Sequence, residues 1–283
     1  MGFQSFAAIG RNADQNIHWQ YIYKPTTPAH GATNLFIDLN QTSGVPKYNP
    51  FSGSALTATQ LVGQGNLGVY VGNTIPGKTK HLLSCQFKQL TTSNGPPDYV
   101  HVLDYLMFYP LIDTDDPAEQ VTDNPVSIPR YNDGMIVLIV QSPLASSAPM
   151  TINYTNQSGV SGQTSTATII AGSAIGVCAT AVGAVGGASQ ATPFFPLANG
   201  DYGVRSIESI TMAGSAGGFV CAAIVKPIAT VPIYEALVPS EKNHAMFGQY
   251  PPEIKDGACL NFIIQRGASA TGAYRGEMLF VNS

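Results

Sequence analysis

The chain has 283 residues, a formal net charge of −4 at pH 7 and only 11% charged residues, against roughly 25% in an average soluble domain. Its 13 basic residues are scattered and form no run, so a basic surface for direct nucleic-acid binding is not expected. The 29 Gly and 20 Pro residues predict many turns and few long helices. A surface so poor in charge favours a subunit that meets neighbours in an assembly, and an ordinary neutral β domain is the alternative.

Residues 1–50 are predicted to form an extended, Pro- and Asn-rich arm with short strands. Hydrophobic residues alternate with period two from Ile17 to Tyr23, which indicates a strand. Prolines at 25, 28, 46 and 50 favour extended chain over helix. The opening sequence MGFQSF lacks the basic and apolar regions of a secretory signal, so export is not expected.

Residues 51–283 are predicted to form a β-sandwich of the jelly-roll kind. The run YVHVLDYLMFYPLI, residues 99–112, is apolar on both faces except at Asp104. Such a run is either a buried central strand or a helix, and its aromatic and β-branched residues favour the strand. Residues 110–134 are acidic and Pro-rich, which predicts a long surface loop. A short helix at DPAEQV is possible there, with Asp116 as its cap and Pro117 in its first turn.

The second half of the chain predicts further short strands with Gly, Asn and Pro at the joins, as in a sandwich or jelly roll. Residues 169–190 are apolar and uncharged, with glycine pairs Gly172/Gly176 and Gly183/Gly187. That spacing is typical of packed membrane helices, but most residues here are Ala, Gly, Ser or Thr, too weakly apolar to span a bilayer. We therefore expect no membrane partner, and two short strands or a flat loop buried against a neighbouring subunit.

The four cysteines, Cys85, Cys178, Cys221 and Cys259, lie far apart and each sits in or beside an apolar run. Metal sites usually show close pairs such as CxxC, which this chain lacks. We expect four buried, reduced thiols, as in a protein assembled in a cytosol.

The sequence MTINYTNQSGVSGQTSTAT, residues 150–168, contains a GxxG loop at Gly159 and Gly162. Phosphate-binding loops lead from a strand into a helix and usually carry Lys, whereas this loop joins two strands and has no basic neighbour in the sequence. A hairpin tip with glycines at positive φ is the favoured interpretation. The alternation then predicts an uncharged, hydrogen-bonding sheet face, a candidate subunit contact, formed by Thr151, Asn153, Thr155, Thr164, Thr166 and Thr168.

Other candidate chemistry is weak. His101 and Asp104 are three apart on a strand and are expected on opposite faces. Asp113, Asp115 and Asp116 lack the Gly and distal Glu of a calcium loop, and no GxSxG nucleophile motif is present. We therefore assign no catalytic, cofactor-binding or metal-binding residues, and the expectation is a protein that is not an enzyme.

Four segments resemble structural proteins of tailed-bacteriophage virions. They are YPLIDTDD…IPRYNDG, MTINYTNQSGVSGQT, FFPLANGDYGVRSIESITM and AYRGEMLFVNS. The resemblance implies a virion part with a β-sandwich fold, and a capsid decoration (cement) protein is one such role. It also implies synthesis in the host cytoplasm and a final place on the capsid surface.

The leading hypothesis from the sequence is therefore a decoration protein that contacts major capsid subunits and its own copies, with a homo-oligomer expected and a trimer plausible. A tail or fibre component, or a module that binds host glycans, is the alternative. A β-sandwich hydrolase is disfavoured because no catalytic motif is found. A major capsid protein of the tailed-phage type is also disfavoured, because its long spine helix is not seen in the sequence.

Overall fold

The computed structural model describes residues 17–28, 33–62, 68–91, 97–123, 126–171, 174–180, 190–244, 250–267 and 271–283. Across these ranges the chain is almost all β, as predicted, and η1 (Leu39–Gln41) is a single 3₁₀ turn.

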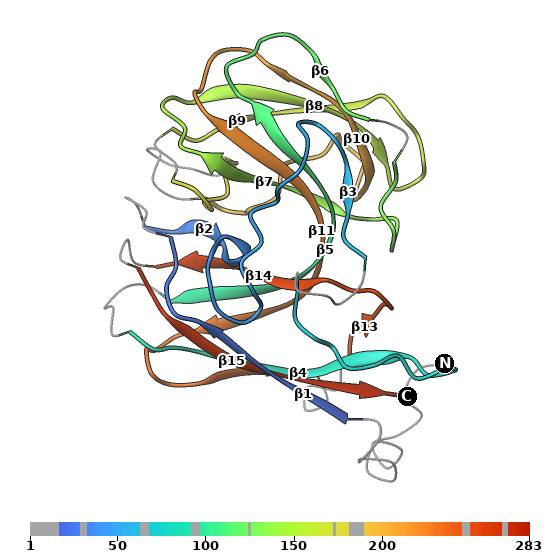
Figure 1. Cartoon of the computed structure of the whole chain (residues 1–283), viewed down its shortest axis with the longest axis vertical. Coiled ribbons are helices and arrows are strands. Elements are labelled where there is room, and N and C mark those ends of the chain that lie inside the picture. The colour runs from blue at the N-terminus through green and yellow to red at the C-terminus, as the bar shows by residue number, and fades with distance from the viewer. Residues whose placement is uncertain are drawn as a thin grey trace.

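The strands form three antiparallel sheets, which we call lower, middle and upper after their places in Figure 1. The lower sheet has the order β1 (Ile17–Lys24), β15 (Tyr274–Asn282), β4 (Lys80–Gln89) and β12 (Ser240–Asn243), with β13 (Glu253–Ile254) also on β4. The middle sheet has the order β2 (Leu35–Asp38), β14 (Leu260–Arg266), β5 (Asp98–Asp113), β11 (Phe219–Ile233) and β7 (Met135–Ser142), with β3 (Thr59–Gln60) on β5. The upper sheet has the order β6 (Gln120–Val121), β10 (Val204–Met212), β8 (Ala148–Asn156) and β9 (Gln163–Ile169).

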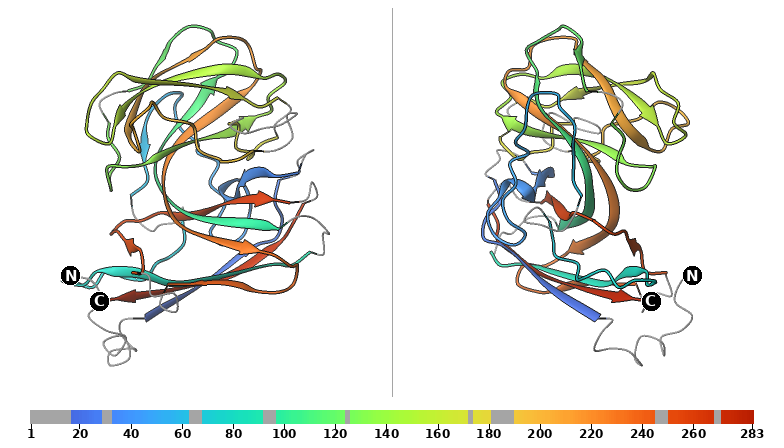
Figure 2. Two further views of the ribbon diagram at one scale, coloured as in Figure 1. Left: turned by 180° about the vertical axis from the view of Figure 1, so that it is seen from behind. Right: turned by 45° about the vertical axis from the view of Figure 1, so that its right-hand side comes forward.

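Two long strands, β5 and β11, run through both halves of the molecule. They are 16 and 15 residues long and pair along most of their length, with three register shifts. Extra residues at such shifts bend and twist a strand pair, and Figure 2 shows β5 and β11 curving from the upper half into the lower half. The middle sheet therefore supplies one layer to each of two sandwiches.

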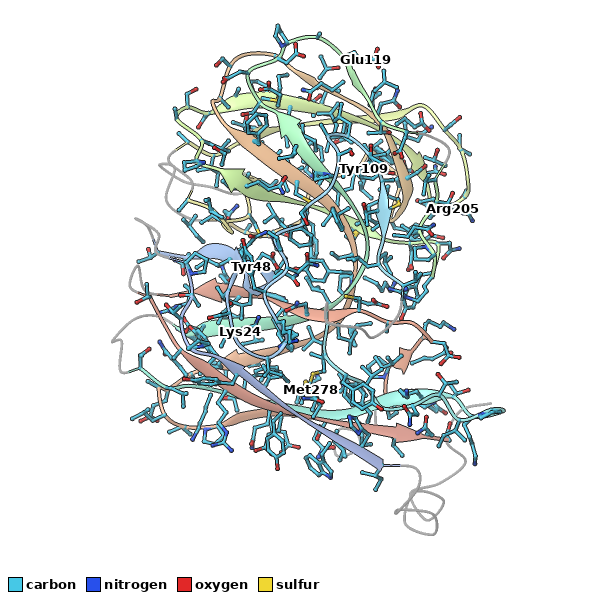
Figure 3. The ribbon with its side chains drawn as sticks, viewed as in Figure 1. Lys24, Tyr48, Tyr109, Glu119, Arg205 and Met278 are labelled. Atoms are coloured by element: carbon cyan, nitrogen blue, oxygen red, sulfur yellow. The ribbon has the colours of Figure 1, made fainter. Side chains whose placement is uncertain are left out.

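Each sandwich has its own hydrophobic core. In the upper core, Tyr109 of β5 and Ile224 of β11 pack among Ile152 and Ile207 of the upper sheet. In the lower core, Val100 of β5 packs with residues of the lower sheet such as Met278. Figure 3 shows Tyr109 and Met278 in these separate regions. The strand prediction for residues 99–112 is confirmed, because the middle of β5 is buried on both faces.

Several segments depart from the sequence prediction. Within residues 1–50, predicted as an extended arm, β1 pairs with β15 and β2 pairs with β14, so these strands belong to the chain's own sheets. The predicted loop 110–134 overlaps β5, which continues to Asp113, and contains β6. The helix at DPAEQV was a wrong prediction, because Asp116 instead closes a turn by accepting a hydrogen bond from the Ala118 N–H at 2.9 Å.

The loop 110–134 is also more tightly held than its polar composition suggests. The Gln120 side chain donates to the Asp113 carbonyl at 2.7 Å and accepts from the Asp113 N–H at 2.9 Å. Such a two-point amide contact satisfies main-chain groups that a β-ladder would otherwise pair. It therefore fixes the start of β6 against the end of β5.

The four cysteines are buried and free, as predicted. In the small-residue segment 169–190, residues 172–173 and 181–189, with Gly172, Gly183 and Gly187, lie outside the described residues. The described part makes isolated bridges within this chain, from Val177 to Ile37, from Cys178 to Ile139 and from Thr180 to Ile169. Those described residues are therefore packed against the chain's own strands.

Candidate functional site

The predicted hairpin forms, and its six candidate residues share one face of the upper sheet. β8 pairs with β9, so that Thr151 lies opposite Thr166, Asn153 opposite Thr164 and Pro149 opposite Thr168. The Oγ1 atoms of Thr151 and Thr166 are 2.8 Å apart and hydrogen-bonded. Thr164, Thr166 and Thr168 on β9 are exposed, whereas Ile152 and Tyr154 on the opposite face of β8 are fully buried. The chain thus presents an uncharged row of hydroxyl groups, and its role as a subunit contact remains a prediction.

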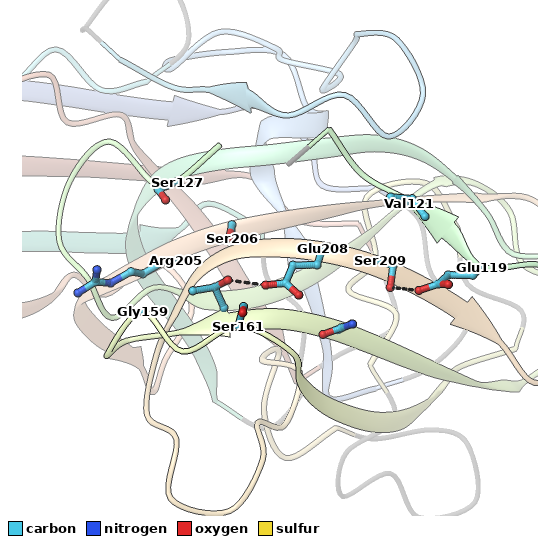
Figure 4. Close-up of a pocket in the computed structure, with 11 residues that line it drawn as sticks. Glu119, Val121, Ser127, Gly159, Ser161, Arg205, Ser206, Glu208 and Ser209 are labelled. Carbon is cyan, nitrogen blue, oxygen red and sulfur yellow. Dashed lines mark hydrogen bonds between the residues drawn. The ribbon is translucent and has the colours of Figure 1, made fainter. Parts of the chain in front are cut away.

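A polar groove of about 630 Å³ lies beside this face, over β10 and the hairpin tip. Figure 4 shows side chains from β10, from the hairpin and from the segment leading into β6 around it. Its charged lining residues are Glu119, Arg205 and Glu208. Asn153 and Thr155 of the predicted face also line it, so the groove and the face are continuous.

Glu208 ties the hairpin to β10. Its carboxylate accepts a hydrogen bond of 2.5 Å from the Thr155 hydroxyl and one of 3.2 Å from the Gly162 N–H. Hydrogen bonds to an ionised carboxylate are shorter and stronger than neutral ones. Glu208 therefore holds both the strand and the far end of the tip in one arrangement.

The hairpin tip is closed by its own side chains. Asn156 Oδ1 accepts from the N–H groups of Ser158 and Val160, each at 3.0 Å. Gly159 and Gly162 have φ values of +81° and +72°, which only glycine adopts readily. This confirms the hairpin interpretation of the GxxG motif.

The fold adds a basic residue that the sequence around the loop does not contain. Arg205 of β10 packs over the tip, and a Cβ built on Gly159 would lie 3.4 Å from its Nη1. Even so, the Gly162 N–H already donates to a carboxylate of the chain. A bound phosphate would face Glu208 at that place, so the arrangement favours a structural loop over an anion site.

The second carboxylate of the groove is also held by the protein. Glu119 Oε1 accepts a 2.6 Å hydrogen bond from the hydroxyl of Ser209 (Figure 4). Sequence reasoning missed Glu119, Arg205 and Glu208, because they come from a turn and a distant strand, and only the β10–β8 register brings β10 beside the hairpin.

The remaining candidate residues are kept apart by the fold. His101 Nδ1 lies 3.0 Å from Thr230 Oγ1, whereas Asp104 binds Arg130, and burial lowers the pKa of His101 to about 4. Asp113 and Asp115 each accept a main-chain N–H, from Asp115 at 2.9 Å and from Gly217 at 2.7 Å. No group of three or more His, Cys, Asp or Glu side chains within the described ranges is placed to hold a metal ion.

Comparison with known proteins gives weak similarities. No protein-family model and no curated protein matches the chain. Among solved structures, T=1 particles derived from infectious bursal virus match with a TM-score of 0.20 and 10% identity, over 94% of this chain and 78% of that one. The VP2 subviral particle of infectious bursal disease virus matches with a TM-score of 0.21 and 10% identity, over 94% and 80%. TM-scores this low carry no argument about function.

In the part of the chain that the structure describes, no helix is long and apolar enough to cross a membrane.

Proposed function

We propose that the chain is a non-enzymatic structural subunit of a virus particle, and specifically a decoration (cement) protein on the head of a tailed bacteriophage. In this role it contacts the major capsid protein and its own copies on the capsid surface, after synthesis in the host cytoplasm. The observation that carries the proposal is the exposed, uncharged hydroxyl row of the β8–β9 hairpin.

The hairpin face suits a subunit contact for a physical reason. Threonine hydroxyls both donate and accept hydrogen bonds, and covering them removes no charge from water. The face is already ordered by the Thr151–Thr166 hydrogen bond and by the bond from Thr155 to Glu208. A preorganised surface loses little conformational entropy when a partner covers it.

Three of the segments that resemble phage virion proteins meet at the upper sheet. Tyr154 of the hairpin donates to Asp201 of the FFPLANGDYG segment at 2.8 Å. Gly134 of the IPRYNDG segment bridges Val204 at the start of β10. These segments together position the hairpin face, which supports a shared role for them in the proposed function: to hold a contact surface.

The groove supports a structural role over catalysis. Its two carboxylates accept hydrogen bonds from Ser209, Thr155 and Gly162 of the chain itself. A general acid or base needs a carboxyl group within reach of a substrate proton, whereas these groups hold the turn before β6 and the hairpin in place.

On a capsid lattice the same contact is repeated many times, so contacts that are individually weak act together to hold the subunits.

The experiment changes Thr164 and Thr168 together to Lys. Both side chains are exposed on β9, so the variant adds charge to the face without breaking the bond between Thr155 and Glu208. We expect wild-type protein to co-sediment with genome-free phage heads and the variant to lose this binding. A matched control changes the exposed Thr26 and Thr57, away from the face, to Lys. Wild-type protein that does not co-sediment with the heads would contradict the proposal.

A further inference from the structure

Strand β1 presents three large aromatic side chains in one exposed row. Trp19, Tyr21 and Tyr23 are 53%, 59% and 47% exposed, whereas Ile22 and Lys24 of the same strand are buried. Because alternate residues of a strand point to the same face, the three rings stand side by side on the outer face of the lower sheet. Trp and Tyr are enriched among the few residues that supply most of the binding energy of protein interfaces.

The same strand forms an open sheet edge. β1 is the terminal strand of the lower sheet, with β15 on one side and no strand of the described residues on the other (Figures 1 and 2). On that open side Tyr23 exchanges two main-chain hydrogen bonds with Val45, at 3.0 and 2.7 Å. In an antiparallel strand the main-chain groups of alternate residues point to the same side. Those of Ile17, Trp19 and Tyr21 therefore point to the open edge as well.

One carbonyl confirms this direction. Tyr21 O accepts a 2.8 Å hydrogen bond from the side-chain amide of its neighbour Gln20, a contact that a pairing strand would replace with a main-chain N–H. Natural sheet edges are usually protected by charge, proline or a bulge. Residues 17–23, IHWQYIY, contain no charged residue and no proline, and the Lys24 ammonium is turned inward to the carbonyls of Thr42 and Pro46. The described edge of β1 therefore has neither charge nor proline, and its register with β15 contains no bulge.

We propose that β1 pairs antiparallel with β1 of a second copy of this chain, about a two-fold axis that passes beside Trp19. Val45 occupies the main-chain groups of Tyr23, which leaves Ile17, Trp19 and Tyr21 for the partner. A symmetric pairing of these three sets Trp19 opposite Trp19 of the second copy, and Ile17 opposite its Tyr21. This inference rests on the proposed function, in which copies of the chain contact one another, and it identifies β1 as the strand that makes that contact.

The charges favour a second copy as the occupant. The exposed row of β1 is uncharged, so two copies meet without like-charge repulsion, whereas a charged partner strand would find no counter-charge on it. On the neighbouring strand β15, the charged residues Arg275 and Glu277 lie opposite Tyr23 and Tyr21, one strand away from the open edge. A two-fold pairing is self-complementary and brings aromatic side chains together across the strands, a favourable cross-strand combination.

Cysteine cross-linking tests the register. Directly opposed residues in a hydrogen-bonded antiparallel pair have Cα atoms about 5.5 Å apart, within the roughly 4.4–6.8 Å range of disulfides. Trp19→Cys should therefore form a covalent dimer on mild oxidation. A mixture of Ile17→Cys and Tyr21→Cys proteins, which keeps Trp19, should cross-link between the two variants far more than Tyr21→Cys does alone. The native cysteines are buried and give little background.

Sedimentation tests the association without a cross-link. The dimer of the Trp19→Lys variant should dissociate at least tenfold more readily than the wild-type dimer. The control is Tyr250→Lys, at a tyrosine that is 86% exposed outside the strands, and its dimer should dissociate as the wild-type dimer does. A monomeric wild-type protein with no cross-linking at position 19 would overturn the pairing. Loss of glycan retention in Trp19→Lys, with wild-type protein monomeric, would also overturn it and assign the row to a sugar ligand.

The pairing and the proposed function fail in different ways. Wild-type dimers that cross-link in the expected register but do not bind phage heads would keep the pairing and remove the decoration role. Monomers that bind heads through the hairpin face would remove the pairing and keep the role.

Discussion

Arg130 and Asp104 form a buried two-point ion pair that joins the 110–134 segment to the middle of β5. Arg130 Nε donates to Asp104 Oδ2 at 3.1 Å and Nη2 donates to Oδ1 at 2.8 Å. The Cys259 N–H donates to the same carboxylate at 2.8 Å, and Arg130 Nη1 donates to the Leu61 carbonyl at 2.7 Å. Burial raises the pKa of Asp104, while its hydrogen bonds to Arg130 oppose the shift. Asp104, the one acidic residue within the apolar run 99–112 of β5, thus holds a segment that is distant in the sequence.

Removing one partner of this pair should destabilise the fold strongly. In Arg130→Met the carboxyl group of Asp104 stays buried without its counter-charge, and we expect the free energy of unfolding to fall by about 3–5 kcal/mol. Urea denaturation followed by circular dichroism measures it. The control is Lys255→Met, which removes the exposed pair with Glu253 and should cost less than about 1 kcal/mol. If the free energy of unfolding fell equally in the two variants, the buried ion pair would contribute no more to stability than the exposed one, which would contradict the prediction.

Asp38 should make stability fall as pH rises through the mildly acidic range. Its carboxyl group is fully buried, and burial raises its pKa from 3.8 to about 6 against the opposing hydrogen bonds from Tyr105 and Asn40. Between these values the folded state binds more protons than the unfolded state. The stabilisation of the folded state by protonation of Asp38 is therefore fully present below pH 4. It is lost as the pH rises through 6, which lowers the free energy of unfolding by roughly 2–3 kcal/mol.

The variant Asp38→Asn isolates this effect, because an amide does not titrate. The difference in unfolding free energy between variant and wild type should grow in favour of the variant by roughly 2–3 kcal/mol from pH 4 to pH 7. Chemical denaturation at half-unit pH steps gives the curve. Lys24, whose pKa burial lowers to about 8, titrates above this window. A difference that stays constant with pH would contradict the assignment.

Glu208 should control the mobility of the hairpin tip. Glu208→Ala removes the acceptor for Thr155 and for the Gly162 N–H, and a net loss of roughly 1–3 kcal/mol is expected. Hydrogen–deuterium exchange of residues 157–163 should speed up in this variant. Glu119→Ala is the matched control, since Glu119 lines the same groove but binds Ser209. Faster exchange at the tip in both variants would argue against the role of Glu208.

The native thiols should be inert to water-soluble thiol reagents. Burial raises the pKa of Cys85 and Cys259 to about 12, and it raises the pKa of Cys178 and Cys221 well above the usual value. Thiolate is the reactive form and buried thiols are inaccessible, so the folded protein should react slowly and release all four thiols only on denaturation. Tyr250→Cys, at a side chain that is 86% exposed outside the strands, should add one fast-reacting thiol as a positive control. A fast-reacting native thiol in wild-type protein would contradict the burial.

The sequence alone determined the all-β class, the hairpin at residues 150–168 and the burial of residues 99–112. These features depend on local rules: side chains alternate along a strand, glycine is needed at positive φ, and continuous apolar runs are buried on both faces. The six residues predicted for the hairpin face lie on one side of the sheet for the same reason. Pro-rich and polar composition in residues 1–50 and 110–134 does not reveal that the short strands β1, β2 and β6 pair with other strands of the chain.

Only the tertiary structure decided which distant residues meet. The pairing of β10 with β8 places Arg205 and Glu208 beside the hairpin, and the curve of β5 and β11 divides the protein into two sandwiches. The position of β1 at the edge of the lower sheet also depends on the tertiary structure, because the alternation of its residues predicts a strand but not its place in a sheet. Contacts between residues far apart depend on register and chain path, and a one-dimensional pattern of side chains specifies neither.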